Sequence, residues 1–161
     1  EEVGNDAARF FYVLRSNEQH LDFDLELAKS KTNENPVYYI QYAHARISSV
    51  FHQLAEKSFH YNEKNGIKNL HLLSTNKERE LMTTLSKFPE ILLLASKNRA
   101  PHNLAQFLRE LANEFHSYYN ESVFIVNDQD LRDARMTLIK ATQIVVSTGL
   151  KIIGVSSPTS M

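Results

Sequence analysis

The sequence predicts an all-α protein, a helical bundle, from three observations. The chain has 161 residues but only 4 Gly and 4 Pro, so few positions interrupt a helix. Apolar residues recur over long stretches at the i, i+3, i+4 and i+7 spacing of one helix face. The connections between these stretches are short, which favours antiparallel packing. A composition of 42% hydrophobic and 23% charged residues is ordinary for one globular domain, or for one domain with a fragment of another.

The first elements of the chain are expected to be short. Residues 5–15 predict a helix with Asn5 or Asp6 as its N-cap. Residues 21–25 alternate apolar and acidic side chains, a period of two that is typical of an extended segment. Residues 26–31 favour a second short helix.

A long helix is predicted next. Asn35 can cap it, and Pro36 suits its first position because a missing N–H costs nothing there, so the helix should run from here to about Phe59. Its apolar stripe consists of Ile40, Ala43, Ile47, Val50, Phe51 and Leu54. Residues 62–69 are polar and contain a glycine, which predicts a loop.

The second half of the chain predicts three further helical stretches. Two of them are expected at residues 76–97 and 102–120. The first of these should bend or break at Pro89, which removes a backbone hydrogen bond. After a short apolar connector, the last helix is predicted to begin at Asp128 or Asp130 and to end with Gly149 as the residue after its C-cap.

The charge of the chain is unevenly distributed. The formal net charge of −1 gives no indication of a strongly basic nucleic-acid binder. However, residues 1–34 carry 8 acidic and 4 basic side chains, whereas residues 35–161 carry 11 acidic and 14 basic ones. The absence of cysteine excludes disulfides and thiolate metal sites. No apolar run approaches the roughly 20 residues of a membrane span, so no membrane partner is expected.

The residue patterns argue against catalysis and against a metal site. The four glycines are too scattered to form a phosphate-binding loop. His44 and His52 are separated by more than two helical turns, so we expect both on a polar helix face and no metal between them. Asp22 and Asp24 could be read as paired carboxylates, but helix capping and solvent contacts are the favoured interpretation.

A polar and aromatic ridge follows the margin of the long helix. At 100° per residue, with Tyr39 at zero, Tyr42 lies at about 300°, Arg46 at about 340°, Gln53 at about 320° and Lys57 at about 0°. Tyrosine rings beside a guanidinium suit splayed-out bases and their phosphates. An alternative remains open, in which the tyrosines pack against a neighbouring helix and Arg46 pairs with a carboxylate.

A second aromatic and polar cluster occurs near the end of a later helix. It reads F-H-S-Y-Y-N at residues 115–120 and includes Tyr118 and Tyr119. The cluster supports nucleic-acid binding, although Phe115 is expected to belong to the core.

Several blocks of the chain resemble arginyl-tRNA synthetases, especially bacterial ones. Residues 33–46, N-E-N-P-V-Y-Y-I-Q-Y-A-H-A-R, are similar to the hallmark helix of that family. Residues 2–16 and 21–28 resemble the segments that precede this helix, and residues 134–141 and 149–161 resemble the C-terminal end of the family. The blocks cover essentially the whole chain in collinear order.

The resemblance implies a fragment of a class I synthetase. Residues 1–32 would be a stem-contact remnant that follows the catalytic domain, and residues 33–161 would be the all-α anticodon-binding domain. ATP and arginine would bind the catalytic domain, before Glu1, so no cofactor and no catalytic residue is expected in this chain. The chain lacks an initiator Met, and we expect it to be part of a longer, cytoplasmic, monomeric enzyme that charges tRNA(Arg), with residues 156–161 as its finished tail.

The resemblance also implies which residues contact RNA. Tyr39, Tyr42 and Arg46 match family residues that contact the anticodon region, and Met161 matches the chain end that approaches it. The further expected contacts are Gln53, Tyr118 and Tyr119. The family's D-A-L-R segment is D-A-R-M at residues 133–136, and this departure puts a base-contacting role for Arg135 in question.

A different class of function also fits a helical bundle with exposed tyrosines. In this alternative, the chain is a protein–protein interaction module whose tyrosines contact a partner protein. Such binding should be insensitive to competitor tRNA, whereas binding through an anticodon site should not.

Overall fold

The computed structural model describes residues 3–16 and 23–161, and every regular element within these ranges is helical. The elements are α1 (Asn5–Leu14), α2 (Leu25–Lys29), α3 (Pro36–Glu56), α4 (Glu63–Lys68), the 3₁₀ turn η1 (Leu70–Leu72), α5 (Asn76–Ser86), α6 (Phe88–Lys97), α7 (Pro101–Glu121) and α8 (Gln129–Ile152). The prediction of an all-α bundle is therefore confirmed. No described helix is long and apolar enough to cross a membrane.

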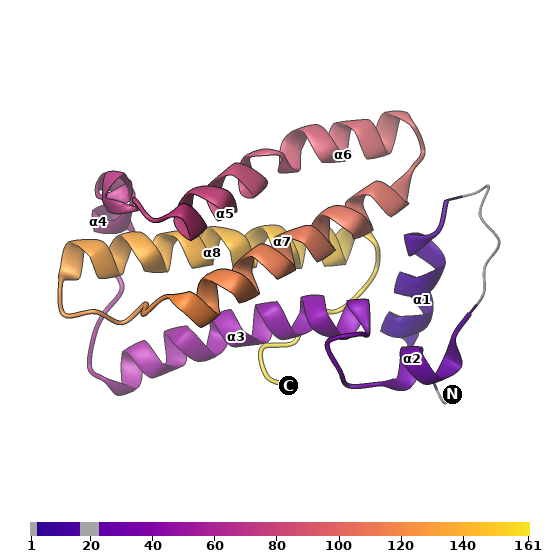
Figure 1. Ribbon diagram of the computed structural model, residues 1–161, viewed down its shortest axis with the longest axis horizontal. Coiled ribbons are helices and arrows are strands. Elements are labelled where there is room, and N and C mark those ends of the chain that lie inside the picture. Colours follow the sequence, from indigo (N-terminus) through magenta and orange to yellow (C-terminus); the bar gives the residue numbers. More distant parts are fainter. Residues whose placement is uncertain (1–2, 17–22) are drawn as a thin grey trace.

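Helix α7 lies at the centre of the bundle (Figure 1). It packs against α3 on one side, against the α5–α6 pair on the other, and against α8 along its length. Short α1 and α2 lie at one end of the bundle and α4 at the other. Fully buried side chains of all the long helices fill the space between them, among them Ile40, Leu81, Leu108, Phe115 and Ile139.

The start of α3 forms as the sequence predicts. The Asn35 side chain accepts hydrogen bonds from the backbone N–H groups of Val37 and Tyr38, and Pro36 occupies the first helical turn. The Asn35 amide also donates to the Ala28 and Ser30 carbonyls, 3.2 and 2.8 Å away. The cap therefore ties α3 to the end of α2, and it is itself almost fully buried.

The predicted loop at residues 62–69 is wrong, because this segment forms α4. Asn62 caps the helix by accepting a hydrogen bond from the Asn65 N–H. Gly66 is the glycine that suggested a loop, but a Cβ at this position would collide with the Thr137 hydroxyl and the Asp133 carbonyl of α8. The glycine thus permits close helix packing and does not mark a turn.

The predicted end of α8 at Gly149 is also wrong, by about one helical turn. Gly149 lies inside the helix, where a Cβ would collide with the Leu108 side chain of α7. The residue after the C-cap is Gly154, whose φ of +73° favours glycine. Its N–H donates to the Lys151 carbonyl, and the next N–H, of Val155, donates to the Leu150 carbonyl, which is a Schellman motif.

Other boundaries follow the predictions closely. The helical stretch 76–97 breaks at Lys87, and Pro89 lies in the first turn of α6. Gly4, and not Asn5 or Asp6, is the N-cap of α1. Asp24 caps α2 through the Leu27 N–H, in line with the favoured interpretation of that carboxylate. Residues 21–22, including Asp22, lie outside the described residues.

Candidate nucleic-acid interface

The seam between α3 and α7 carries a continuous set of rings. The Tyr42 ring stacks on the Tyr38 ring, 6.1 Å between centroids, and on the His116 ring of α7, 5.7 Å away. The Tyr39 ring also contacts His116, with 4.4 Å between ring centroids, and its hydroxyl donates to the Asn113 side-chain oxygen. Tyr38, Tyr39 and Tyr42 are each partly exposed, so their rings line the seam at the protein surface.

Arg46 lies between two of these rings. Its Cζ is 4.5 Å from the centroid of Tyr42 and 4.6 Å from that of Tyr119 on α7. Its Nη1 donates to Nδ1 of His116 at 3.2 Å. Among the residues that the structure describes, no carboxylate forms an ion pair with Arg46, so that part of the alternative left open by the sequence is wrong. The other part is confirmed, because Tyr39 and Tyr42 pack against His116 of the neighbouring helix α7. The guanidinium is held by rings and keeps an uncompensated positive charge.

His116 is a neutral hydrogen-bond relay beneath Arg46. Burial, together with the nearby Arg46 charge, lowers the pKa of His116 to about 4. Because Nδ1 accepts from Arg46, the proton lies on Nε2, which donates to the Tyr39 backbone carbonyl at 3.1 Å. His116 therefore fixes the positions of Arg46 and α3 without adding a second positive charge. We name the set Tyr38, Tyr42, Arg46, His116 and Tyr119 the Arg46 platform.

A surface cavity of about 250 Å³ adjoins the Arg46 platform. Tyr119 is shared between the two, and the cavity continues between the C-terminal half of α3 and the loop that follows α7. Its lining consists of Val50, Gln53, Lys57, Tyr119, Ser122, Val123, Phe124 and Ile125. The structure thus places Gln53 in the cavity that adjoins Tyr42, Arg46 and Tyr119. Tyr39 lines a separate cavity with Arg109 and Asn113 of α7.

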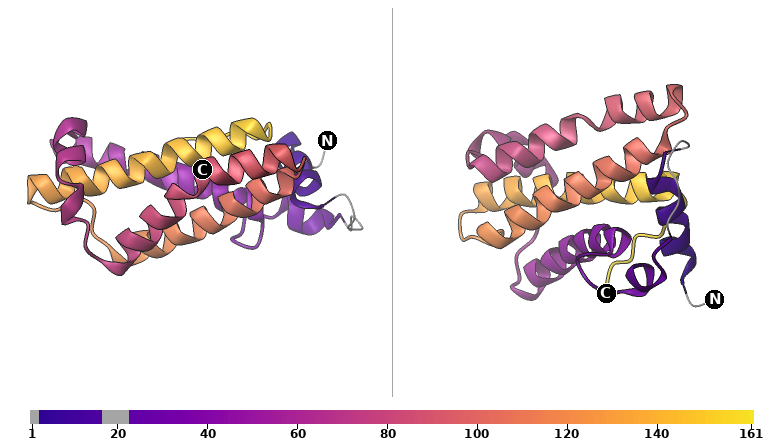
Figure 2. Two further views of the ribbon diagram at one scale, coloured as in Figure 1. Left: turned by 90° about the horizontal axis from the view of Figure 1, so that it is seen from above. Right: turned by 45° about the vertical axis from the view of Figure 1, so that its right-hand side comes forward.

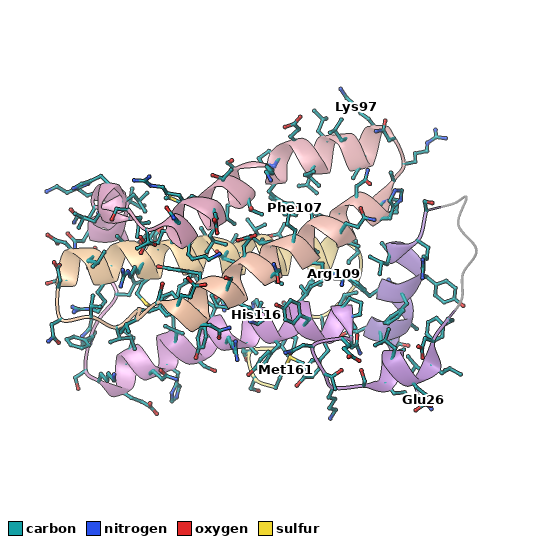
Figure 3. The ribbon with its side chains drawn as sticks, in the orientation of Figure 1. Glu26, Lys97, Phe107, Arg109, His116 and Met161 are labelled. Carbon is teal, nitrogen blue, oxygen red and sulfur yellow. The ribbon has the colours of Figure 1, made fainter. Side chains whose placement is uncertain are left out.

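The C-terminal tail approaches α3 from another side. The sequence predicts a partly exposed polar face for His44, but this side chain is buried against the tail. Its Nδ1–H donates to the Pro158 carbonyl at 2.8 Å. His52, in contrast, is exposed and faces Glu56. Met161 is 51% exposed at the end of this tail, and Figure 3 shows both His116 and Met161 close to α3.

The structure contradicts a contact role for Tyr118. This side chain has no exposed surface, and its hydroxyl donates to Oε1 of Glu78 at 3.2 Å. Burial and the Glu78 carboxylate raise the pKa of Tyr118. Consecutive residues of a helix lie about 100° apart, so Tyr119 faces Arg46 while Tyr118 faces the core. Tyr118 is a structural residue and is not available to RNA.

Arg135 has a structural partner as well. Its Nε donates to Oε1 of fully buried Glu78 at 2.9 Å, and its Nη1 donates to the Val123 carbonyl at 2.6 Å. Burial acts to raise the pKa of Glu78, but bonds from Thr75 and Arg135 outweigh it and lower that pKa. Arg135 therefore fixes the loop that forms one wall of the cavity.

Sequence reasoning missed two members of the Arg46 platform. Tyr38 lies one helical turn before Tyr42, a spacing that brings two rings together on a helix surface. His116 lies in the quoted aromatic cluster, but only the pairing of α3 with α7 shows that it supports Arg46. Among the described residues, no group of three or more His, Cys, Asp or Glu is arranged to hold a metal ion.

The chain is similar to arginine–tRNA ligases along its whole length. It is 58% identical over 160 residues to the arginine–tRNA ligase of Coxiella burnetii (strain RSA 493 / Nine Mile phase I), and the match covers 99% of this chain and 27% of that protein. It is 52% identical over 161 residues to the arginine–tRNA ligase of Legionella pneumophila (strain Paris), which covers 27% of that protein. The chain thus spans about a quarter of the length of these relatives.

Solved structures show the same likeness. The Thermus thermophilus arginyl-tRNA synthetase matches 97% of this chain with a TM-score of 0.79 and 31% identity, over 26% of its own length. The Plasmodium falciparum arginyl-tRNA synthetase shares the fold at 20% identity, with a TM-score of 0.81 over 99% of this chain and 27% of its own. In addition, the DALR anticodon binding domain model matches residues 40–161. The family model does not favour the protein-interaction alternative, and the chain belongs to the family of DALR anticodon-binding domains.

Proposed function

We propose that this chain recognises the anticodon loop of tRNA(Arg) as part of an arginine–tRNA ligase. The full-length enzyme attaches arginine to tRNA(Arg) and converts ATP to AMP, while ATP and arginine bind a catalytic domain that precedes this chain. The enzyme acts as a monomer in the cytoplasm. Residues 1–32 connect the two parts, and residues 33–161 bind the RNA. The single observation that carries this proposal is Arg46, held between the Tyr42 and Tyr119 rings with no carboxylate partner among the described residues.

The Arg46 platform supplies two kinds of contact. Its partly exposed tyrosine rings offer π faces on which unpaired bases of a loop can stack. The guanidinium has further N–H donors beyond the one used on His116, and these suit a phosphate or the acceptor edge of a base. Because rings and His116 already fix the guanidinium, little side-chain entropy is lost when RNA binds.

The adjoining cavity and the tail extend the contact surface. Gln53 can donate to and accept from a base edge, and Lys57 adds a positive charge at the same cavity. Met161 and the backbone near it present further groups beside α3. The neutralisation of phosphates by these cations makes the affinity dependent on salt concentration.

The test is a titration of tRNA(Arg) against the 161-residue chain and its Tyr42→Ala variant at two salt concentrations. Stacking contributes roughly 1–3 kcal/mol per base, so Tyr42→Ala should weaken binding by about 5- to 150-fold at both salt concentrations. The matched control is Tyr12→Ala, which removes a 63%-exposed tyrosine of α1 outside the Arg46 platform.

Three outcomes separate the alternatives. Loss of affinity in Tyr42→Ala but not in Tyr12→Ala supports the proposal. Equal affinity of wild type and Tyr42→Ala contradicts the role of the Arg46 platform. A tRNA with a different anticodon that binds as tightly as tRNA(Arg) contradicts anticodon recognition and leaves only general RNA binding.

A further inference from the structure

The first helix of the chain holds the last residues in place. Asp6, in the first turn of α1, accepts hydrogen bonds from both the backbone N–H and the hydroxyl of Ser156, the N–H bond being 3.2 Å long. Asp6 and Ser156 are 150 residues apart in the sequence. Figure 2 shows the tail leaving the end of α8 and passing α1 on its way to α3.

Helix α3 completes this attachment. Nε2 of Gln41 donates to Oδ2 of Asp6 at 2.8 Å and to the Ser156 carbonyl at 3.0 Å, so one amide joins all three segments. Two residues further along the tail, the Pro158 carbonyl accepts from His44. Gln41 and His44 are only 8% and 7% exposed, so their bonds to Asp6 and the tail are partly buried.

The turn before Ser156 fits the same attachment. Gly154 adopts a φ of +73°, and a Cβ there would collide with the Arg9 guanidinium of α1. The Schellman motif at the end of α8 therefore directs the chain along α1 towards Asp6. The direction of the tail is set by backbone geometry, and its position is set by Asp6 and Gln41.

The tail and α7 border the exposed face of α3 from two sides. On the helical wheel, the tail contacts His44 and Gln41 lie at about 140° and 200°, whereas Tyr42 and Arg46 of the Arg46 platform lie at about 300° and 340°. The exposed residue Ser49 lies between them, at about 280°. An RNA loop on the Arg46 platform would therefore have the tail at its other margin.

We infer that Asp6 and Gln41 form a clasp that positions the C-terminal tail for RNA binding. The inference rests on the proposed function and extends it to α1, which lies outside the matched segment 40–161. Asp6 is a positioning residue: it contacts the tail and not the RNA. Without it, the tail samples many conformations, and this freedom must be lost when RNA binds.

The decisive variant is Asp6→Asn, which keeps the size of the side chain and removes its charge. Loss of a negative charge by itself strengthens binding to RNA, because repulsion of phosphates decreases. The clasp predicts weaker binding, because preorganisation of the tail is lost. The dissociation constant of the anticodon stem-loop of tRNA(Arg) should become five- to tenfold larger. The matched control is Asp24→Asn, which removes a charge from the cap of α2 and should not weaken binding.

A second background shows whether the effect passes through the tail. A truncation after Pro158 removes residues 159–161 but leaves the bonds to Asp6, Gln41 and His44 in place. In this background, Asp6→Asn should have no further effect on RNA affinity. An equal loss with and without residues 159–161 would contradict the inference, as would unchanged or tighter binding by Asp6→Asn in the full chain.

The outcomes also separate this inference from the proposed function. If wild type binds and Tyr42→Ala does not, but Asp6→Asn binds as wild type, the clasp alone fails. If wild type does not bind the stem-loop, anticodon recognition fails and the role of the clasp in RNA binding fails with it. NMR relaxation of the amides of residues 156–161 without RNA then still reports whether Asp6→Asn frees the tail.

Discussion

Tyr118 and Tyr119 are consecutive residues of α7, but they belong to two different arginine clusters. Tyr118 is fully buried and donates to Glu78, which also accepts from Arg135. Tyr119 is partly exposed and presents its ring face to Arg46. In the first cluster the positive charge is neutralised by a carboxylate inside the core, whereas in the second it is held by rings at the surface.

This difference shows which arginine can bind an anion. The charge of Arg135 is already compensated by Glu78, and its Nη1 donates to the Val123 carbonyl. Arg46 has aromatic faces and one imidazole nitrogen as partners, so its charge is available to a phosphate or base. The buried cluster fixes the loop beside the cavity, and the surface cluster is the one that we propose contacts RNA.

The largest expected effect comes from breaking the buried pair. Arg135→Met leaves the Glu78 carboxylate buried without its cation and should lower the free energy of unfolding by about 3–5 kcal/mol. Arg46→Met removes two cation–π contacts and the hydrogen bond to Nδ1 of His116, and should cost about 2 kcal/mol, less than Arg135→Met. Urea denaturation of both variants checks the comparison. Equal losses would mean that the two arginines are not held differently.

Acid should weaken the fold through His116. The folded state holds its pKa at about 4, below the ordinary value of 6.5, so the folded state favours the neutral ring. This stabilisation is complete above pH 6.5 and is lost as the pH falls from 6.5 towards 4, by up to about 3 kcal/mol. Stability measured against pH should therefore fall more steeply in wild type than in His116→Gln. Parallel curves would show that His116 ionises as freely in the folded state as in the unfolded one.

The smallest effects on stability are expected at the two tyrosine hydroxyls. Tyr118→Phe removes one donor from buried Glu78 and should cost about 1–2 kcal/mol without changing RNA affinity. Tyr119→Phe keeps the ring beside Arg46 and should change stability by less than about 0.5 kcal/mol. Thermal or urea unfolding of the two variants distinguishes them. A larger loss in Tyr119→Phe would reverse the assignment of core and surface roles.

Much of the fold could be predicted because helix signals are local. Asn35 and Pro36 mark the start of α3, and the apolar stripe of α3 is buried as its spacing indicates, with Phe51 only partly so. The errors concern glycines whose role depends on a distant helix. Gly66 and Gly149 look like turn residues in the sequence, but both allow close approach between helices.

The candidate site could be predicted only in part, for the same reason. The wheel of α3 places Tyr39, Tyr42 and Arg46 on one ridge, and in the structure all three side chains contact residues of α7. The wheel could not show that α7 adds His116 and Tyr119, nor that Tyr118 faces inwards to Glu78. These facts depend on the rotation of α7 relative to α3 and α5. The division of the chain at residues 32 and 33 stays a prediction.

We propose that the Arg46 platform binds the anticodon loop through a specific site and not through charge alone. The direct test compares Arg46→Gln with Arg79→Gln, which removes the same charge from an exposed position on α5. The measurement is the dissociation constant of the tRNA(Arg) anticodon stem-loop at physiological salt. Arg46→Gln is expected to weaken binding by about tenfold or more, and Arg79→Gln by no more than about twofold. Equal effects of the two variants would contradict a specific site at the Arg46 platform.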